Sequence, residues 1–99
     1  MWVMAMFDLP VYTKEQCRTA SGFRKSLILK GFTMLQKSIY IRCVDSTYDS
    51  TMAYLMARLP KEGKVSFIKI SDQLFSSSIF IENSCEKPPP EAVRRAYIF

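Results

Sequence analysis

The chain has 99 residues and a mass of 11.5 kDa, which is enough for one hydrophobic core and leaves no room for a second. Hydrophobic residues make up 48% of the sequence, so we expect a folded protein. The longest apolar run, residues 1–7, is far shorter than the ~20 residues that cross a bilayer, and no basic segment precedes it. We therefore expect a cytoplasmic protein with no membrane partner.

The sequence contains no histidine, which excludes Ser-His-Asp and Cys-His nucleophiles and His-containing zinc sites. Any catalysis would depend on carboxylates, Lys, Tyr, Ser or Cys, or on a metal held by oxygen atoms. The three cysteines form no C-x-x-C pair, so we interpret them as reduced packing residues. Fourteen Lys and Arg against nine Asp and Glu give a net charge of +5, which favours a polyanionic partner such as nucleic acid. The alternative is a basic surface that serves solubility.

Residues 1–7 predict a central β-strand, because apolar side chains occupy both of its alternating faces. The strand ends at Asp8, since a proline follows two residues later. Thr13 and Gln16 have the T-x-x-Q spacing of a capping box, which predicts a helix from there to about Lys30. Gly31 is typical of the residue just beyond a helix end.

The rest of the chain predicts further strands and a second helix. A tight turn near Lys37 joins two short strands, and a second capping box at residues 46–49 begins a helix that Pro60 stops. The expected strands are residues 32–36, 38–44, 64–70 and 78–82. A stiff Pro-containing linker is expected in residues 83–90, followed by a tail over residues 91–99.

The predicted order is βαββαβ with extra C-terminal strands, which is typical of a ferredoxin-like, two-layer α+β sandwich. Both helices of such a domain cover one face of the sheet. Because residues 1–7 are apolar on both faces, we expect a homodimer in which two sheets pack together, with residues 78–82 added to the partner's sheet edge. Residues 1–82 would form the ferredoxin-like domain, and residues 83–99 the linker and docking tail.

Asp8 is the main candidate for chemistry, because it lies at the carboxyl end of the predicted central strand. The alternative is an Asp that only begins the turn before Pro10. One carboxylate is too few for a divalent ion, but two copies of Asp8 near a dimer axis could hold Mg²⁺. The sequence therefore predicts a metal site shared between two chains.

Basic side chains along the first helix form the expected phosphate-binding surface. At about 100° per residue, Lys14, Arg18 and Lys25 lie opposite the core face of the helix, and Arg24 flanks them. Lys37 and Arg42 are further nucleic-acid-binding candidates. The alternative is a solvated helix face without a ligand.

Several sequence blocks resemble one family in their order and spacing. They are residues 6–10 (MFDLP), 23–27 (FRKSL), 31–32 (GF), 34–40 (MLQKSIY), 59–65 (LPKEGKV) and 70–75 (ISDQLF). Over residues 1–82 the chain resembles the small CRISPR-associated adaptation protein, the second of the two universal Cas proteins, in the version that accompanies type II systems. The resemblance implies a ferredoxin-like homodimer with a metal-dependent phosphodiesterase site, in which the residue at the position of Asp8 binds the metal and is catalytic.

The resemblance also implies a role in spacer acquisition, with the CRISPR integrase, double-stranded DNA and single-stranded RNA as partners. We expect an Mg²⁺- or Mn²⁺-dependent endonuclease or endoribonuclease that bridges copies of the integrase. One alternative is a non-catalytic, duplex-DNA-binding scaffold of the integrase complex, which needs the basic helix but not Asp8. Another is a ferredoxin-like regulatory domain that binds a small ligand, and the low glycine content disfavours it.

The apolar end of the tail is the expected docking element for the integrase. Tyr97, Ile98 and Phe99 follow a Pro-rich spacer, and an apolar end of this kind has little reason to be exposed alone. The alternative is a strand that packs on its own dimer.

Overall fold

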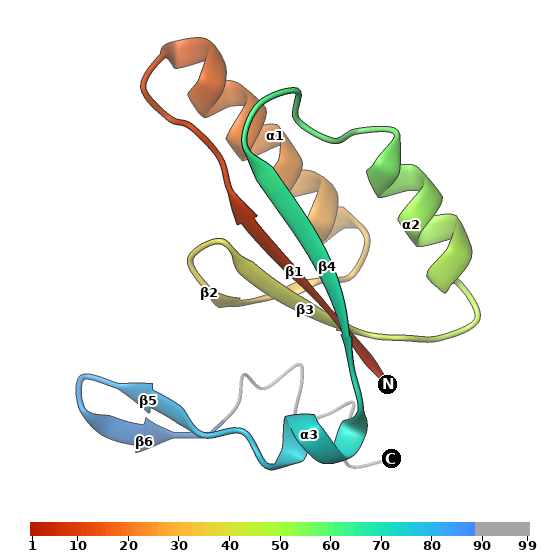
Figure 1. Cartoon of the computed structure of the whole chain (residues 1–99), viewed down its shortest axis with the longest axis vertical. Helices are drawn as coiled ribbons and strands as arrows, with labels where there is room; N and C mark the ends of the chain where they lie inside the picture. The colour runs from red at the N-terminus through yellow and green to blue at the C-terminus, as the bar shows by residue number, and fades with distance from the viewer. Residues whose placement is uncertain (89–99) are drawn as a thin grey trace.

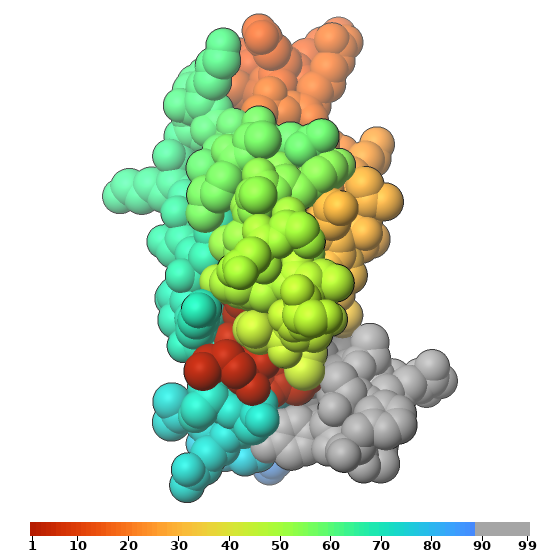
Figure 2. All heavy atoms as spheres, turned by 90° about the vertical axis from the view of Figure 1, so that its right-hand side faces the viewer, coloured from red at the N-terminus to blue at the C-terminus, as the bar shows by residue number. Residues whose placement is uncertain are grey.

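The structure is a computed structural model that describes residues 1–88, and its architecture is ferredoxin-like α+β (Figure 1). Helices α1 and α2 cover one face of a four-stranded antiparallel sheet with strand order β2-β3-β1-β4. Figure 2 looks onto α2, with β4 on one side of it and α1 on the other. The predicted fold class is therefore confirmed. In chain order the elements are β1 (Trp2–Asp8), α1 (Lys14–Leu29), β2 (Thr33–Gln36), β3 (Ile39–Cys43), α2 (Tyr48–Met56), β4 (Lys64–Ile70), α3 (Asp72–Ser76), β5 (Phe80–Glu82) and β6 (Cys85–Lys87).

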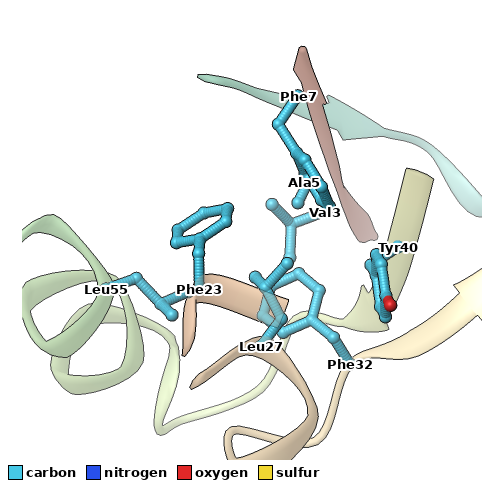
Figure 3. Close-up of a cluster of buried hydrophobic side chains, with 8 residues drawn as sticks. All are labelled: Val3, Ala5, Phe7, Phe23, Leu27, Phe32, Tyr40 and Leu55. Atoms are coloured by element: carbon cyan, nitrogen blue, oxygen red, sulfur yellow. The ribbon is translucent and has the colours of Figure 1, made fainter. Parts of the chain in front are cut away.

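Strand β1 is central, as its two-sided apolar pattern predicts. It pairs with β3 on one side and with β4 on the other. Its Val3, Ala5 and Phe7 side chains are buried on the helix side and pack with Phe23 and Leu27 of α1 (Figure 3). The core between the sheet and the helices is therefore built around β1, and it fixes the position of the residue that ends this strand.

The first helix begins and ends as predicted. The Thr13 side chain accepts a hydrogen bond from the Gln16 amide at 3.0 Å, and the Gln16 side chain accepts one from the Thr13 amide at 3.1 Å. These two bonds complete the capping box. Gly31 follows the helix with φ +85°, a conformation that favours glycine.

The predicted capping box of the second helix is wrong. Helix α2 begins after Thr47, not after Ser46, and no side chain caps it. The Thr47 hydroxyl instead donates to Asp45 at 2.6 Å and accepts a bond from Arg42. The Thr47 hydroxyl, which could have capped the helix, is therefore bonded within a side-chain network that the local sequence pattern does not reveal.

Among residues 1–88, the sheet face away from α1 and α2 has a buried cluster at one end only. There Trp2, Ile41 and Phe75 form a second buried cluster, with the rings of Trp2 and Phe75 4.7 Å apart. Phe75 belongs to α3, a short helix that the sequence analysis did not predict. Toward the other end, Met6 is 37% exposed and Ile68 is 44% exposed. An apolar strip therefore remains open on this face.

The C-terminal part of the described chain is a hairpin and not a linker. Strands β5 and β6 pair only with each other among residues 1–88, joined by Asn83 and Ser84, which both have positive φ. Two such residues match the tight turn that connects antiparallel strands. This corrects the expectation for the start of the segment 83–90, while Tyr97, Ile98 and Phe99 lie outside the described residues. No helix within residues 1–88 is long and apolar enough to span a membrane.

Candidate functional site

Asp8 is the last residue of β1, and its side chain is exposed. Because side chains alternate along a strand, Asp8 shares the open face of the sheet with Met4 and Met6, opposite the face that α1 and α2 cover. Its carboxylate makes no ion pair and no side-chain hydrogen bond within residues 1–88. The structure thus presents Asp8 as an available oxygen donor at the end of the central strand.

The loop before β4 holds the backbone of Asp8 closely. Gly63 has φ +90°, and a Cβ built on it would lie 2.5 Å from the carbonyl oxygen of Asp8. A side chain at this position would therefore collide with the end of β1. The next residue, Lys64, pairs directly with Asp8 in the antiparallel ladder. Sequence reasoning missed both residues, because only the pairing of β1 with β4 brings them to Asp8.

The donor set at Asp8 fits part of a magnesium site. Carboxylate oxygens are the ligands that Mg²⁺ prefers, and the ion is commonly bound through one or two carboxylates with water. Within the described chain no group of three or more His, Cys, Asp or Glu side chains lies together. Asp8 is therefore not part of a cluster of three such side chains within residues 1–88, and a metal site shared with a second copy of Asp8 stays a prediction.

The basic residues of α1 lie on the other outer surface of the molecule. Lys14, Arg18 and Lys25 are exposed, Arg24 is half-buried, and the core side of the same helix carries Ala20, Phe23 and Leu27. These basic side chains point away from the sheet, whereas Asp8 lies on its far face. Lys37 is exposed in the turn between β2 and β3. The structure does not bring the α1 residues together with Asp8 within one chain.

Arg42 is bound within its own chain. Its guanidinium is half-buried and donates to the hydroxyls of Thr51 and Thr47, each at 2.6 Å, and to the Asp45 carboxylate at 3.3 Å. These bonds join β3 to the start of α2. A role for Arg42 in phosphate binding stays a prediction, and it would compete with this network.

The same network affects the acidity of Asp45. The Thr47 hydroxyl, then the Thr47 amide, and then the charge of Arg42 hold the pKa of the Asp45 carboxyl below its usual value. The carboxylate is therefore ionised at neutral pH and serves to orient Arg42.

A groove of about 550 Å³ lies beside the end of β1, and the sequence analysis did not predict it. It is lined by the loop after β1, the first turns of α1 and the loop that joins α2 to β4. The side-chain amide of Gln16 donates a hydrogen bond to the Glu62 carboxylate at 3.2 Å and links two of these walls. Pro10, which follows β1, and Pro60, which follows α2, are local signals for these loops, but they do not indicate that the loops lie together.

The sequence is similar to proteins of one family. The family model described as "CRISPR associated protein Cas2" matches residues 1–77. A protein of Paracidovorax avenae named "CRISPR-associated endoribonuclease Cas2" is 35% identical over 94 residues, which cover 93% of this chain and 87% of that protein. Proteins with the same name from Flavobacterium psychrophilum and Parvibaculum lavamentivorans are 39% and 40% identical over 77 residues, covering 67% and 76% of their lengths. Since the family model spans most of the chain and these relatives align over most of their own lengths, the chain belongs to the Cas2 family of CRISPR-associated proteins.

Proposed function

We propose that this chain is a metal-dependent endonuclease that acts on phosphodiester bonds and takes part in CRISPR adaptation. The observation that carries the proposal is Asp8, an exposed carboxylate without a protein partner in residues 1–88, at the end of the central strand. Its setting in a family whose relatives are named endoribonucleases supports RNA hydrolysis.

The active form is a homodimer. Met6 and Ile68 lie in the open apolar strip of the sheet, and burial of such a strip favours association. Strand β4 is an edge strand, and the exposed β5–β6 hairpin is not part of the main sheet, so it is available to extend the partner's edge. Packing of two open faces brings two copies of Asp8 to one interface. Sedimentation as a monomer at micromolar concentration would contradict this assembly.

Asp8 from each chain would hold one Mg²⁺ or Mn²⁺. When bound, such an ion activates water for attack on phosphorus and neutralises the charge that develops on the phosphate oxygens. The sequence has no histidine to hold the ion, and the proposal assigns that role to the Asp8 carboxylates. The protein's own contribution is to fix both carboxylates on a rigid strand and to bind the nucleic acid around them.

The α1 surface favours a second function, that of a scaffold for double-stranded DNA. Lys14, Arg18 and Lys25 lie on the layer opposite Asp8, so a duplex bound there would not need the carboxylate. In this role the dimer would bridge copies of the CRISPR integrase. The docking residues Tyr97, Ile98 and Phe99 lie outside the described part of the chain, and their role stays a prediction.

The test is a cleavage assay with labelled single-stranded RNA and duplex DNA in Mg²⁺ or Mn²⁺. Asp8→Asn and Asp8→Ala should both abolish cleavage, because either change removes the charge that holds the ion. A chelator should stop the wild-type reaction. Asn is nearly isosteric with Asp, so Asp8→Asn separates the loss of charge from the loss of side-chain shape.

The two variants should keep their fold and oligomeric state, since Asp8 makes no ion pair or side-chain hydrogen bond within residues 1–88. Metal-dependent cleavage that persists in purified Asp8→Ala would overturn the assignment of the site. A wild-type protein that binds duplex DNA but cleaves neither substrate would favour the scaffold.

A further inference from the structure

Lys64 is the cross-strand neighbour of Asp8. The two residues form the last pair of the β1–β4 ladder, and both side chains are exposed. Directly opposed residues in an antiparallel pair share a face of the sheet, with Cβ atoms about 4.5–5.5 Å apart. The side chains of Lys64 and Asp8 therefore start from neighbouring positions at one end of the open face, although their charged groups form no ion pair.

The alternation along β4 supports this placement. Val65 and Phe67 pack against the core with the helices, whereas Ile68 lies on the open face with Met4 of β1 as its partner. Lys64 falls on the same open face as Ile68, because the two residues are four positions apart and side chains alternate along a strand. Lys69 falls on the helix side, where its ammonium lies 4.6 Å from the ring centre of Tyr48.

The backbone that carries Lys64 is held in place. The preceding residue, Gly63, packs so closely on the carbonyl of Asp8 that even a methyl group would collide with it. The Cα of Lys64 is therefore fixed relative to that of Asp8. Only the flexible side chain can move, which suits a group that must follow a bound phosphate.

Neither Lys64 nor Asp8 forms an ion pair or a side-chain hydrogen bond with another described residue. An ion pair between two exposed side chains would in any case add little to stability. A cation beside a metal-binding carboxylate instead offers a contact for the anion that must approach the metal.

We propose that Lys64 binds the phosphodiester backbone of the substrate next to Asp8, an inference that rests on the proposed nuclease function. Its ammonium would donate to a phosphate oxygen and offset the repulsion between the Asp8 carboxylate and the nucleic acid. Lys64 thus supplies the basic contact on the open face that the residues of α1, on the opposite layer, cannot supply within the same chain.

The experiment measures binding of labelled single-stranded RNA and of duplex DNA in the presence of a chelator, as a function of salt. Each lost phosphate contact reduces the slope of log binding constant against log salt concentration by about 0.7 for a single strand and about 0.9 for a duplex. Lys64→Ala should therefore weaken RNA binding about fivefold at ~0.1 M salt. Lys64→Arg should retain the affinity. Lys69→Ala is the matched control, because it removes the same charge from the opposite face of the same strand.

A second comparison separates phosphate binding from pairing with Asp8. If Lys64 contacts phosphate, Lys64→Ala should cause the same fivefold loss in an Asp8→Asn background. If the loss disappears there, or if Lys69→Ala causes an equal loss, the proposal is wrong. Binding is measured without metal, so it does not depend on nuclease activity. A failure of the nuclease proposal would appear in the cleavage assay, and the binding result would still test the role of Lys64.

Discussion

Gly63→Ala should be the most damaging of the three glycine-to-alanine changes that this chain allows. Gly63 has φ +90°, a conformation that costs a residue with a side chain ~1–2 kcal/mol. The new Cβ would also lie 2.5 Å from the Asp8 carbonyl oxygen and 3.1 Å from the Cα of Leu9. These are backbone atoms, so the chain itself must move, and such overpacking costs ~1–3 kcal/mol. The free energy of unfolding should fall by about 2–5 kcal/mol.

The other two glycines are matched controls. Gly31 has a similar φ of +85°, but its Cβ would meet only the flexible Arg42 side chain, at 3.5 Å. Gly31→Ala should therefore cost only the conformational part, ~1–2 kcal/mol. Gly22 lies within α1 with nothing within 4 Å of its Cβ position. Gly22→Ala should stabilise the protein by ~0.8–1 kcal/mol, because alanine has the higher helix propensity.

Urea unfolding followed by far-UV circular dichroism measures all three differences. The protein concentration must be the same throughout, because the apparent stability of the proposed dimer would depend on it. If Gly63→Ala loses no more than Gly31→Ala, the close packing of Gly63 on the end of β1 is refuted. In the cleavage assay Gly63→Ala should also reduce metal-dependent activity more than Gly31→Ala does, because it displaces the backbone of Asp8.

Two further predictions concern the Arg42 network and the second cluster. The pKa of Asp45 is lowered by Thr47 and then by Arg42, so ionised Asp45 adds stability that is lost as the pH falls through its folded-state pKa. Asp45→Asn should thus reduce the fall in melting temperature with decreasing pH below about pH 4. A melting temperature that depends on pH as in the wild type would contradict this. Phe75→Ala should cost about 3 kcal/mol and shift the emission of Trp2 to longer wavelength, since the Phe75 ring covers Trp2. An unshifted spectrum would be evidence against that contact.

Local sequence signals were sufficient to predict several elements of the fold. The two-sided apolar pattern of residues 1–7 identified a central strand, and the capping box at Thr13 with Gly31 bounded α1 to within a residue. It also identified Asp8 as the carboxylate at the strand end. Periodicity, caps and turn residues act over a few positions, so they can be read without knowledge of the rest of the fold.

Contacts between segments far apart in the chain could not be predicted from local sequence patterns. Helix α2 begins after Thr47 without a side-chain cap, because the Thr47 hydroxyl donates to Asp45 and accepts from Arg42. Phe75 is buried because α3 packs on Trp2, in a segment whose short sequence shows no helical period. Lys64 stands beside Asp8 only through the register of β1 with β4. Such pairings are set by how the whole core packs, since a slip of one residue would turn every side chain of a strand to the other face of the sheet.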